Sequence, residues 1–385
     1  MMIDQPLSRR TFSRLMGLSA AYAAAGSLPI VNPIRAASSS STVVRLSSNE
    51  NPYGPSHAAL NAMRDSFHLA WRYPDEYADM LTEELATLNS VPAEQILLGD
   101  GSGEILKLSA DAFTGNDKKI VIGNPTFEAI ARHAGVASAE VVKIDLTSDY
   151  RHDLNKMLVA ANGGGLVYIC NPNNPTASIT PSNEISSFLT KVSPTTIVLV
   201  DEAYHHYVET KDYESVIPLV KNHPNLIVAR TFSKIYGMAG LRCGYCVTQP
   251  NNIKLMKVHQ IFDSVNIMAI VAALASVKDP AHVAQGRKLN TEVKKLVCSE
   301  LDSLGYRYIP SHANFMMIDL SSKCGPSSNC SHASTATVPS IIAALAKRGV
   351  EVGRPFPALP SFLRVTIGTS SEMKSFLNAF KAVMG

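Results

Sequence analysis

Short apolar runs separated by polar loops dominate the middle of the chain. The runs cover 119–122, 166–170, 197–200 and 226–229, and loops rich in polar residues, glycine or proline separate them from the next segments. Runs of this length are typical of buried β-strands, and the longer stretches between them have helical periodicity. The alternation of strands and helices therefore predicts an α/β fold with a mainly parallel central sheet.

The pattern changes after this region. A long stretch with helical periodicity covers 251–305, and strands near 306–309, 314–318 and 364–367 follow, with a helix near 338–348. This mixture predicts a second, smaller α+β domain. The predicted organisation is a signal and linker (1–42), an N-terminal arm with a small-domain segment (43–75), a large domain (76–275) and a small C-terminal domain (276–385).

Composition narrows the class of protein. The chain has 385 residues and is 46% hydrophobic, which is enough for a full core and two domains. The 35 basic residues nearly balance the 32 acidic ones and form no basic block, so we do not expect a nucleic-acid partner. His205 and His206 are adjacent and lack the cysteine or carboxylate spacing of a metal site, so we expect pocket-wall or packing residues there and no metal.

Polar residues that could together bind an aldehyde on an aromatic ring follow three of the apolar runs. Lys234 follows the run 226–229, at the sheet edge where open α/β sheets bind ligands. A lysine held there and partly desolvated can lose its proton and bond covalently to an aldehyde. Asp201, after the run 197–200, can pair with a pyridinium nitrogen. Tyr204 and Asn174 can donate to a phenolate oxygen of the same ring.

A phosphate site is predicted beside this lysine. Gly101, Ser102 and Gly103 open an apolar-periodic helix, and a glycine-rich turn into a helix N-terminus presents free N–H groups to a phosphate. The residues that flank the lysine would complete the phosphate site: Thr231, Ser233 and Arg242. The sequence therefore offers a nucleophilic amine, a carboxylate for a ring nitrogen, two donors to a phenolate oxygen and a phosphate site. Together these groups predict that the cofactor is pyridoxal 5′-phosphate.

The order and spacing of these motifs resemble the fold-type I pyridoxal phosphate-dependent aminotransferases. Within them the chain is most similar to the class I/II, histidinol-phosphate aminotransferase-like branch. The resemblance runs from the Ser-Ser-Asn-Glu-Asn-Pro segment at 47–52 to the Arg-Val-Thr-Ile-Gly segment at 364–368. It implies an enzyme that moves an amino group between an amino acid or amino phosphate ester and a 2-oxo acid.

The resemblance also implies roles for further residues. Arg364 would bind the acidic group of the substrate, a carboxylate or a phosphate, and Arg354 is a second candidate for that group. Phe127 would stack on the cofactor ring, and Asn51 is expected near the substrate. Tyr73 would reach the neighbouring subunit's site and contact the cofactor phosphate, which implies a homodimer.

Two departures from the family's pattern bear on the substrate. Ala177 stands where the family usually has glycine, and Gly103 stands where many histidinol-phosphate enzymes have aspartate. The sequence does not identify the amino donor or show whether the substrate carries a phosphate. A decarboxylase or lyase of a phosphorylated amino acid is an alternative on the same scaffold, and a non-catalytic pyridoxal phosphate or amino-acid binding protein is another. A nucleotide-binding dehydrogenase is disfavoured, because Gly101-Ser102-Gly103 is not a Gly-x-Gly-x-x-Gly turn.

The N-terminus has the pattern of a twin-arginine (Tat) export signal. Arg9 and Arg10 precede a mildly apolar, alanine-rich run that ends near small residues at 36–37. That run is too short for a stable membrane span. We therefore expect a periplasmic protein, or a cytoplasmic one if this interpretation fails. In an oxidising compartment Cys324 and Cys330 could pair, and the sequence leaves that open.

Overall fold

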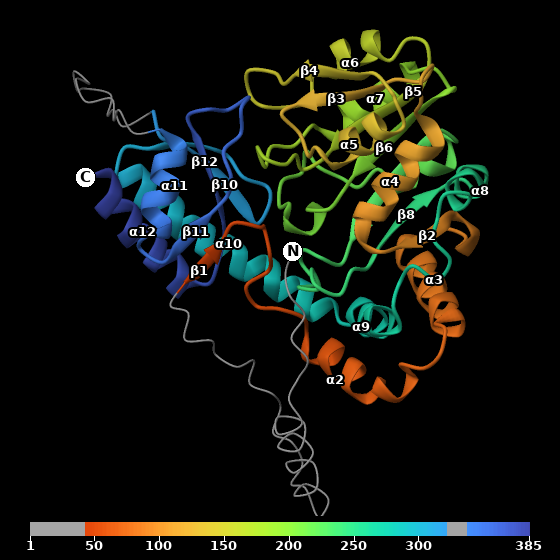
Figure 1. Ribbon diagram of the computed structural model, residues 1–385, viewed down its shortest axis with the longest axis horizontal. Helices are drawn as coiled ribbons and strands as arrows, with labels where there is room; N and C mark the ends of the chain where they lie inside the picture. Colours follow the sequence, from red (N-terminus) through yellow and green to blue (C-terminus); the bar gives the residue numbers. More distant parts are fainter. Residues whose placement is uncertain (1–42, 322–336) are drawn as a thin grey trace, which may run out of the picture. The chain divides into compact units, whose positions relative to one another are not determined.

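The structure of the protein is a computed structural model that describes residues 43–321 and 337–385 (Figure 1). The predicted Tat signal and the cysteines at 324 and 330 lie outside the described residues. Among the described residues, no single helix is long and apolar enough to span a membrane. One pair of helices bent at 83°, 267–277 with 280–303, passes the same test together by length and composition.

The largest sheet has seven strands in the order β2-β8-β7-β6-β5-β3-β4. The five strands from β7 to β4 run parallel, whereas β8 is antiparallel to both of its neighbours. This sheet confirms the predicted α/β fold. The strands are β2 (Ile96–Gly99), β3 (Ile120–Asn124), β4 (Val141–Asp145), β5 (Gly165–Cys170), β6 (Thr196–Asp201), β7 (Leu226–Thr231) and β8 (Gly244–Thr248).

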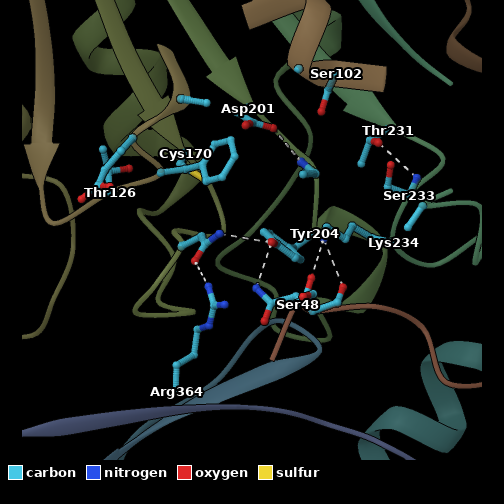
Figure 2. A pocket seen from close by; sticks show the side chains of 18 of the residues that line it. Ser48, Ser102, Thr126, Cys170, Asp201, Tyr204, Thr231, Ser233, Lys234 and Arg364 are labelled. Atoms are coloured by element: carbon cyan, nitrogen blue, oxygen red, sulfur yellow. Dashed lines mark hydrogen bonds between the residues drawn. The ribbon is translucent and has the colours of Figure 1, made fainter. Parts of the chain in front are cut away.

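The parallel strands end at one edge of the sheet and bring their polar ends together. Cys170, Asp201 and Thr231 are the last residues of β5, β6 and β7, which are neighbours in the sheet (Figure 2). Each of these strands is buried along nearly its whole length, as expected for parallel strands covered on both faces. The candidate chemistry therefore converges at the carboxyl edge, although the chain segments are far apart in sequence.

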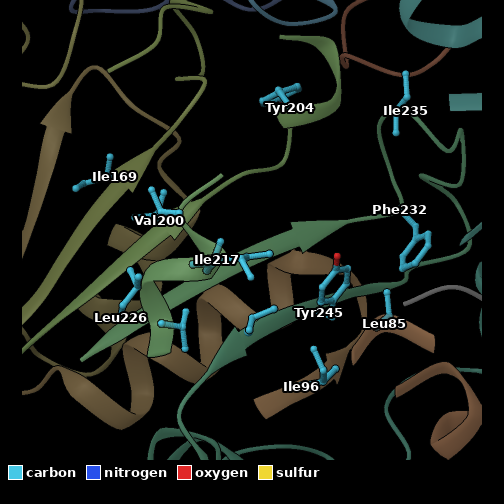
Figure 3. Packing of buried hydrophobic residues seen from close by; sticks show 14 of the residues in the cluster. Leu85, Ile96, Ile169, Val200, Tyr204, Ile217, Leu226, Phe232, Ile235 and Tyr245 are labelled. Atoms are coloured by element: carbon cyan, nitrogen blue, oxygen red, sulfur yellow. The ribbon is translucent and has the colours of Figure 1, made fainter. Parts of the chain in front are cut away.

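Helices cover both faces of this sheet because side chains alternate along each strand. Val198 and Val200 belong to one core cluster, whereas Leu199 between them belongs to another. Figure 3 shows part of the first cluster, in which Leu85 of α3 and Ile96 of β2 are packed. The helices are α2 (His57–Asp65), α3 (Asp75–Asn89), α4 (Gly101–Phe113), α5 (Ala129–Val136), α6 (Leu154–Ala160), α7 (Ser182–Lys191), α8 (Pro250–Lys257) and α9 (Ile267–Val277). Short 3-10 helices lie at Phe67–Leu69, Ala93–Gln95, His205–Tyr207 and Ile217–Lys221.

A separate core lies among the C-terminal elements. It contains Leu46 of the N-terminal arm together with residues between Val293 and Phe380. The arm joins this core because β1 (Val44–Leu46) pairs in parallel with β11 (Val350–Val352). The remaining elements are α10 (Pro280–Ser303), β9 (Arg307–Ile309), β10 (Phe315–Asp319), α11 (Val338–Ala346), β12 (Phe362–Thr366) and α12 (Ser370–Met384).

Two details differ from the sequence prediction. Arg364 was expected to open the last strand but lies in the middle of β12, because the strand already begins at Phe362. The predicted domain boundary between 275 and 276 falls inside α9, which is apolar around its whole surface and packs in the core of the large sheet. The domain limits themselves stay a prediction.

Candidate active site

A cavity of about 370 Å³ lies at the carboxyl edge of the large sheet (Figure 2). Its size is in the range of ligand pockets. Side chains from the strand ends, the N-terminal arm and β12 all face it. The lining residues that the sequence predicted are Ser102, Gly103, Phe127, Asn174, Asp201, Tyr204, Thr231, Ser233, Lys234, Arg242, Arg354 and Arg364.

Lys234 is held in the cavity by the loop that leaves β7. Its Nζ donates to the backbone carbonyl of Asn49 at 3.1 Å and lies 5.5 Å from the centre of the Tyr204 ring. Burial, and then the positive charge of Arg364, lower the pKa of Lys234 to about 8. Far more of this amine is therefore neutral and nucleophilic near neutral pH than for an ordinary lysine, as the sequence predicted for an aldehyde-binding lysine.

Asp201 is buried at the end of β6, with 3% of its surface exposed. Burial raises the pKa of its carboxyl to about 6, while the hydroxyl of Tyr168 and the N–H of Ala203 oppose that shift by donating to the carboxylate. The two hydrogen bonds measure 2.8 Å to Oδ2 and 3.1 Å to Oδ1. A carboxylate in this position can pair with a protonated ring nitrogen.

The hydroxyl of Tyr204 accepts hydrogen bonds from two side-chain amides. Asn49 Nδ2 donates to it at 3.2 Å and Asn174 Nδ2 at 3.4 Å. The amide oxygen of Asn174, Oδ1, accepts from Arg364 Nη1 at 3.0 Å. Burial raises the pKa of Tyr204, so its hydroxyl keeps its proton and can donate to an oxygen in the cavity.

A cradle for an anion lies at the start of α4. Arg242 reaches this helix end and also donates to Ser233 Oγ at 3.3 Å. A Cβ on Gly101 would lie 2.2 Å from Arg242 Nη2, and Gly101 has a φ of +72° that favours glycine. A side chain at this position would displace the guanidinium from the helix end, and the helix N-terminus adds N–H donors. This cradle, with the amine of Lys234 and the acid of Asp201, fits pyridoxal phosphate.

Arg364 and Arg354 form a second cationic region of the cavity. Their guanidinium carbons lie 5.3 and 4.5 Å from the centre of the Phe356 ring. Arg364 donates to Asn174 and to the carbonyl of Ser47 at 2.7 Å, and its buried Nε has no hydrogen-bond partner. Arg354 pairs with Glu128 at 2.9 Å, and both side chains are about half exposed.

The charges that line the cavity do not balance. The described lining residues include five cations, Arg132, Lys234, Arg242, Arg354 and Arg364, and two anions, Glu128 and Asp201. Since a surplus of positive charge in a partly desolvated cavity favours anionic ligands, the site suits a molecule with more than one acidic group.

Three predicted residues are not among the residues that line the cavity: Gly101, which lies against Arg242 at the start of α4, Asn51 and Tyr73. Asn51 does not face it, because its Nδ2 donates to the carbonyl of Ile235 at 2.8 Å and holds the arm to the lysine loop. Asn51 instead lines a neighbouring cavity, and Asn49 takes the place expected for it. Tyr73 is 79% exposed, away from the lining residues, and its proposed contact with a second subunit stays a prediction.

Some residues of the site could not be predicted from the sequence. Asn49 and Ser48 lie in the arm segment that was quoted for the resemblance, and their side chains could not be told apart from that of Asn51 by pattern. Phe356, which packs against both arginines, follows Arg354 by two residues without any distinctive motif. Tyr168 does not line the cavity but bonds to Asp201 behind it, and it had one available signal, a hydroxyl inside a completely buried strand.

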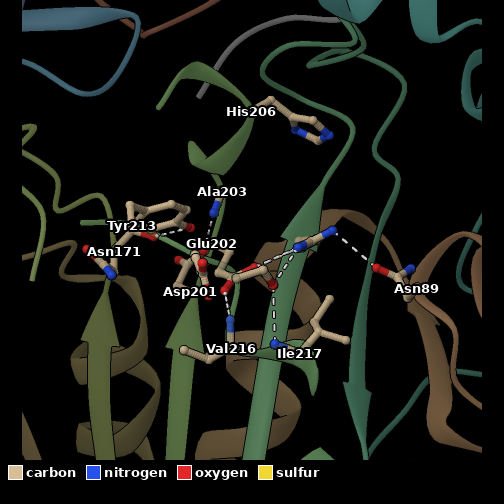
Figure 4. A network of polar contacts seen from close by, with 12 residues as sticks. Asn89, Asn171, Asp201, Glu202, Ala203, His206, Tyr213, Val216 and Ile217 are labelled. Atoms are coloured by element: carbon tan, nitrogen blue, oxygen red, sulfur yellow. Dashed lines mark hydrogen bonds and ion pairs between the residues drawn. The ribbon is translucent and has the colours of Figure 1, made fainter. Parts of the chain in front are cut away.

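A buried ion pair between Glu202 and Arg230, in which both charged groups make several hydrogen bonds, lies next to the cavity. Glu202 follows Asp201 directly, but its carboxylate accepts from Arg230 Nη2 at 2.8 Å and from the N–H of Val216 at 2.8 Å (Figure 4). Arg230 also donates to Ser215 at 2.7 Å and to Asn89 at 3.1 Å. The prediction of pocket-wall or packing residues at 205–206 agrees with two partly buried rings whose centres lie 3.7 Å apart.

Comparison with known proteins gives consistent results. A family described as aminotransferase class I and II matches residues 41–380. A histidinol-phosphate aminotransferase from Moorella thermoacetica is 38% identical over 89% of this chain and 86% of its own length. A solved structure from Erwinia carotovora atroseptica, named after histidinol-phosphate aminotransferase, matches with a TM-score of 0.83 and 31% identity over 89% of this chain and 96% of that one. The structure of a histidinol-phosphate aminotransferase from Sinorhizobium meliloti, in complex with pyridoxal-5′-phosphate, matches with a TM-score of 0.78 and 24% identity over 89% and 90%.

Proposed function

The chain belongs to the aminotransferase class I and II family and is a pyridoxal phosphate-dependent aminotransferase, and from this premise we propose that its amino donor is histidinol phosphate or a closely related amino phosphate ester. The relative from Moorella thermoacetica carries the corresponding name. The family supports transamination, so the alternatives of a decarboxylase, a lyase or a binding protein are set aside.

The unpaired charge of Arg364 is the observation that carries the substrate proposal. The guanidinium is largely buried, yet its described hydrogen-bond partners are neutral oxygens and its Nε has none. Burying a charge without a counter-ion is costly, so an acidic group of the substrate would compensate it. Because Arg354 lies on the same aromatic ring, the two guanidinium groups can embrace a phosphate, which has three oxygens to share.

The other lining residues would hold and orient the cofactor. Ser233, Arg242 and the N–H groups of Ser102 and Gly103 would bind its phosphate. Asp201 would hold a proton on the ring nitrogen, and a ring so charged supplies an acceptor for the electron pair released at the substrate. Two hydrogen-bonded groups, Asn174 and Tyr204, would donate to the ring oxygen, and Phe127 would cover one ring face. Thr231 would support the loop, since its Oγ1 accepts from the N–H of Ser233.

Lys234 would move the proton at the reacting carbon. With its pKa lowered to about 8, the amine can accept a proton from the substrate's α-carbon as a general base and return it as a general acid. Its position between the arm carbonyl of Asn49 and the ring of Tyr204 fixes where that proton can be taken. No other described lysine lines the cavity.

A comparison of amino donors tests this proposal. Histidinol phosphate should change the absorbance of the bound cofactor rapidly, and a 2-oxo acid should restore the original spectrum. Histidinol, which lacks only the phosphate, is the matched control and should react far more slowly. Rapid conversion by aromatic amino acids without conversion by histidinol phosphate would contradict the phosphate-ester assignment and leave a general aminotransferase.

We also propose that the enzyme is a homodimer in which Tyr73 contacts the partner's cofactor phosphate. Large apolar side chains are exposed near this residue, with Trp71 at 77% and Phe262 at 84%. Burial, and then the charge of Asp75, raise the pKa of Asp263, which puts the segment of Phe262 near the start of α3. Light scattering should give twice the chain mass, and Tyr73→Phe should weaken cofactor binding. A monomer with full activity would contradict the dimer.

Export is proposed from the sequence of the N-terminus. Arg9 and Arg10 precede the alanine-rich run, and a Tat signal would carry the folded, cofactor-loaded enzyme to the periplasm. Cell fractionation should find a shortened protein outside the cytoplasm, and replacing both arginines by lysine should retain it inside. Full-length protein found only in the cytoplasm would contradict export.

A further inference from the structure

A tyrosine behind the cavity holds the carboxylate of Asp201. Tyr168 lies in the middle of β5, is completely buried and does not line the cavity. Its hydroxyl donates to Asp201 Oδ2 at 2.8 Å, and Cys170 faces the same region from the end of β5. The register of the two strands pairs Cys170 with Asp201, so Tyr168 reaches the carboxylate diagonally from the neighbouring strand.

The arrangement leaves one side of the carboxylate free. Tyr168 and the N–H of Ala203 occupy one position on each oxygen, and a carboxylate offers about four acceptor positions. Because Asp201 lines the cavity and Tyr168 does not, the remaining positions are available on the cavity side. The tyrosine therefore fixes the direction of the carboxylate without competing for the ligand.

We infer that Tyr168 is a positioning residue that keeps Asp201 ionised and aimed into the cavity, where it can pair with a protonated ring nitrogen. The inference rests on the cofactor role proposed for Asp201 above. Without the hydroxyl of Tyr168, a larger fraction of this buried carboxyl would be protonated near neutral pH, and a protonated carboxyl has no charge with which to stabilise a cation.

The electrostatics of the surroundings support this role. Burial raises the pKa of Asp201 to about 6, and the hydrogen bond from Tyr168 is the largest effect that opposes the rise. Burial also raises the pKa of Tyr168 far above its usual value, so the hydroxyl keeps its proton and remains a donor. The titratable groups that face Asp201 are Tyr168 and Cys170 from β5, Glu202, Tyr204 and Tyr213 from the segment after β6, and Lys234 from the loop after β7.

The direction of the pH effect follows from these groups. Asp201 loses its charge as the pH falls through its pKa, so binding of a cofactor with a protonated ring should weaken below about pH 6. Removing the tyrosine hydroxyl removes a stabilising contact from the charged form only. The midpoint should therefore rise, by about one to two pH units for a hydrogen bond to a charged group.

Tyr168→Phe tests the inference in the full chain with the cofactor removed. The carboxyl titration of Asp201 can be followed by NMR on protein labelled with ¹³C in aspartate, with Asp201→Asn identifying the signal. Tyr306→Phe is a matched control, because it removes a buried hydroxyl from the other core. We expect the midpoint to rise in Tyr168→Phe and to stay unchanged in Tyr306→Phe, with both variants folded by circular dichroism.

A second measurement links the carboxylate to the cofactor. The dissociation constant of pyridoxal phosphate, measured against pH, should show the same upward shift of its midpoint in Tyr168→Phe. An unchanged Asp201 titration would overturn the inference, and so would a shifted titration that leaves cofactor affinity at its original pH dependence. Failure of the proposed function is separate, since it would appear as wild-type protein that no phosphate ester converts.

Discussion

Two buried arginines of this protein differ in what surrounds their charge. Arg230 on β7 has a carboxylate partner and bonds through all three of its nitrogens, to Glu202, Ser215 and Asn89. Arg364 on β12 is also largely buried, but its hydrogen bonds go to two neutral oxygens and its Nε has no partner. The first charge is compensated within the fold and the second is not.

This difference indicates that the charge of Arg230 stabilises the fold, whereas the charge of Arg364 is available to bind a ligand. A buried ion pair whose hydrogen bonds are all made holds segments together, and here it joins the end of α3 to β7 and to the segment that follows β6. A buried cation without a counter-ion is destabilising by itself, and burial lowers the pKa of Arg364 accordingly. The fold tolerates that cost where a substrate can supply the missing negative charge.

The largest expected effect is on stability, and it comes from breaking the ion pair between Arg230 and Glu202. Arg230→Met leaves the carboxylate of Glu202, which is 1% exposed, without its cation. We expect a loss of about 3–5 kcal/mol in the free energy of unfolding, measured by denaturant titration. Lys381→Met is the matched control, since it breaks an exposed pair with Glu300 and should cost less than about 1 kcal/mol. Equal losses in the two variants would remove the distinction.

Truncating the uncompensated arginine should act on catalysis. Arg364→Ala should lose about 2–5 kcal/mol of transition-state binding, or roughly two to three orders of magnitude in kcat/KM with acidic substrates. Its unfolding free energy should change little, because no carboxylate is left unpaired. Arg364→Lys should restore only part of the rate, since a point charge cannot form a paired contact. Unchanged kinetics on every acidic substrate would refute the acid-binding role.

The uncompensated charge should also be detectable at Lys234. After burial, Arg364 is the largest influence that lowers the pKa of Lys234 to about 8. Removing this cation favours the protonated lysine, so the pH midpoint for cofactor uptake by the cofactor-free protein should move upward in Arg364→Ala. Stopped-flow absorbance can follow the uptake. Arg230→Met should leave this midpoint in place, and the same shift in both variants would argue against a direct charge effect.

Arg354 should give the smallest effect on stability. Its pair with Glu128 is about half exposed on both sides, so Arg354→Ala should change the free energy of unfolding by less than about 1 kcal/mol. If it shares a phosphate with Arg364, kcat/KM should fall by at least about tenfold with phosphate esters and little with plain amino acids. Equal, small losses with both kinds of substrate would make Arg354 a surface residue.

The sequence by itself determined the elements and the chemistry at their ends. Apolar runs predicted the strands, and parallel strands place their last residues at one edge, so Asp201 and Lys234 could be assigned to one site before any contact was known. The glycines that open α4 also predicted the anion cradle, and the left-handed backbone conformation of Gly101 requires a glycine there. These predictions depend on periodicity and on steric rules that act within a few residues.

Only the tertiary structure decided which side chains complete the site. Asn49 and Asn51 are two residues apart and chemically identical, yet one bonds to Tyr204 and the other to the carbonyl of Ile235. Likewise, adjacent Asp201 and Glu202 differ because Arg230 reaches only the second. Hydrogen-bond partners and the presence or absence of a counter-ion depend on segments brought together by packing, often more than 100 residues apart, as with the 184 that separate Asn51 from Ile235. No pattern of apolar and polar positions records such contacts, because it reports which side of an element is buried and not what it is buried against.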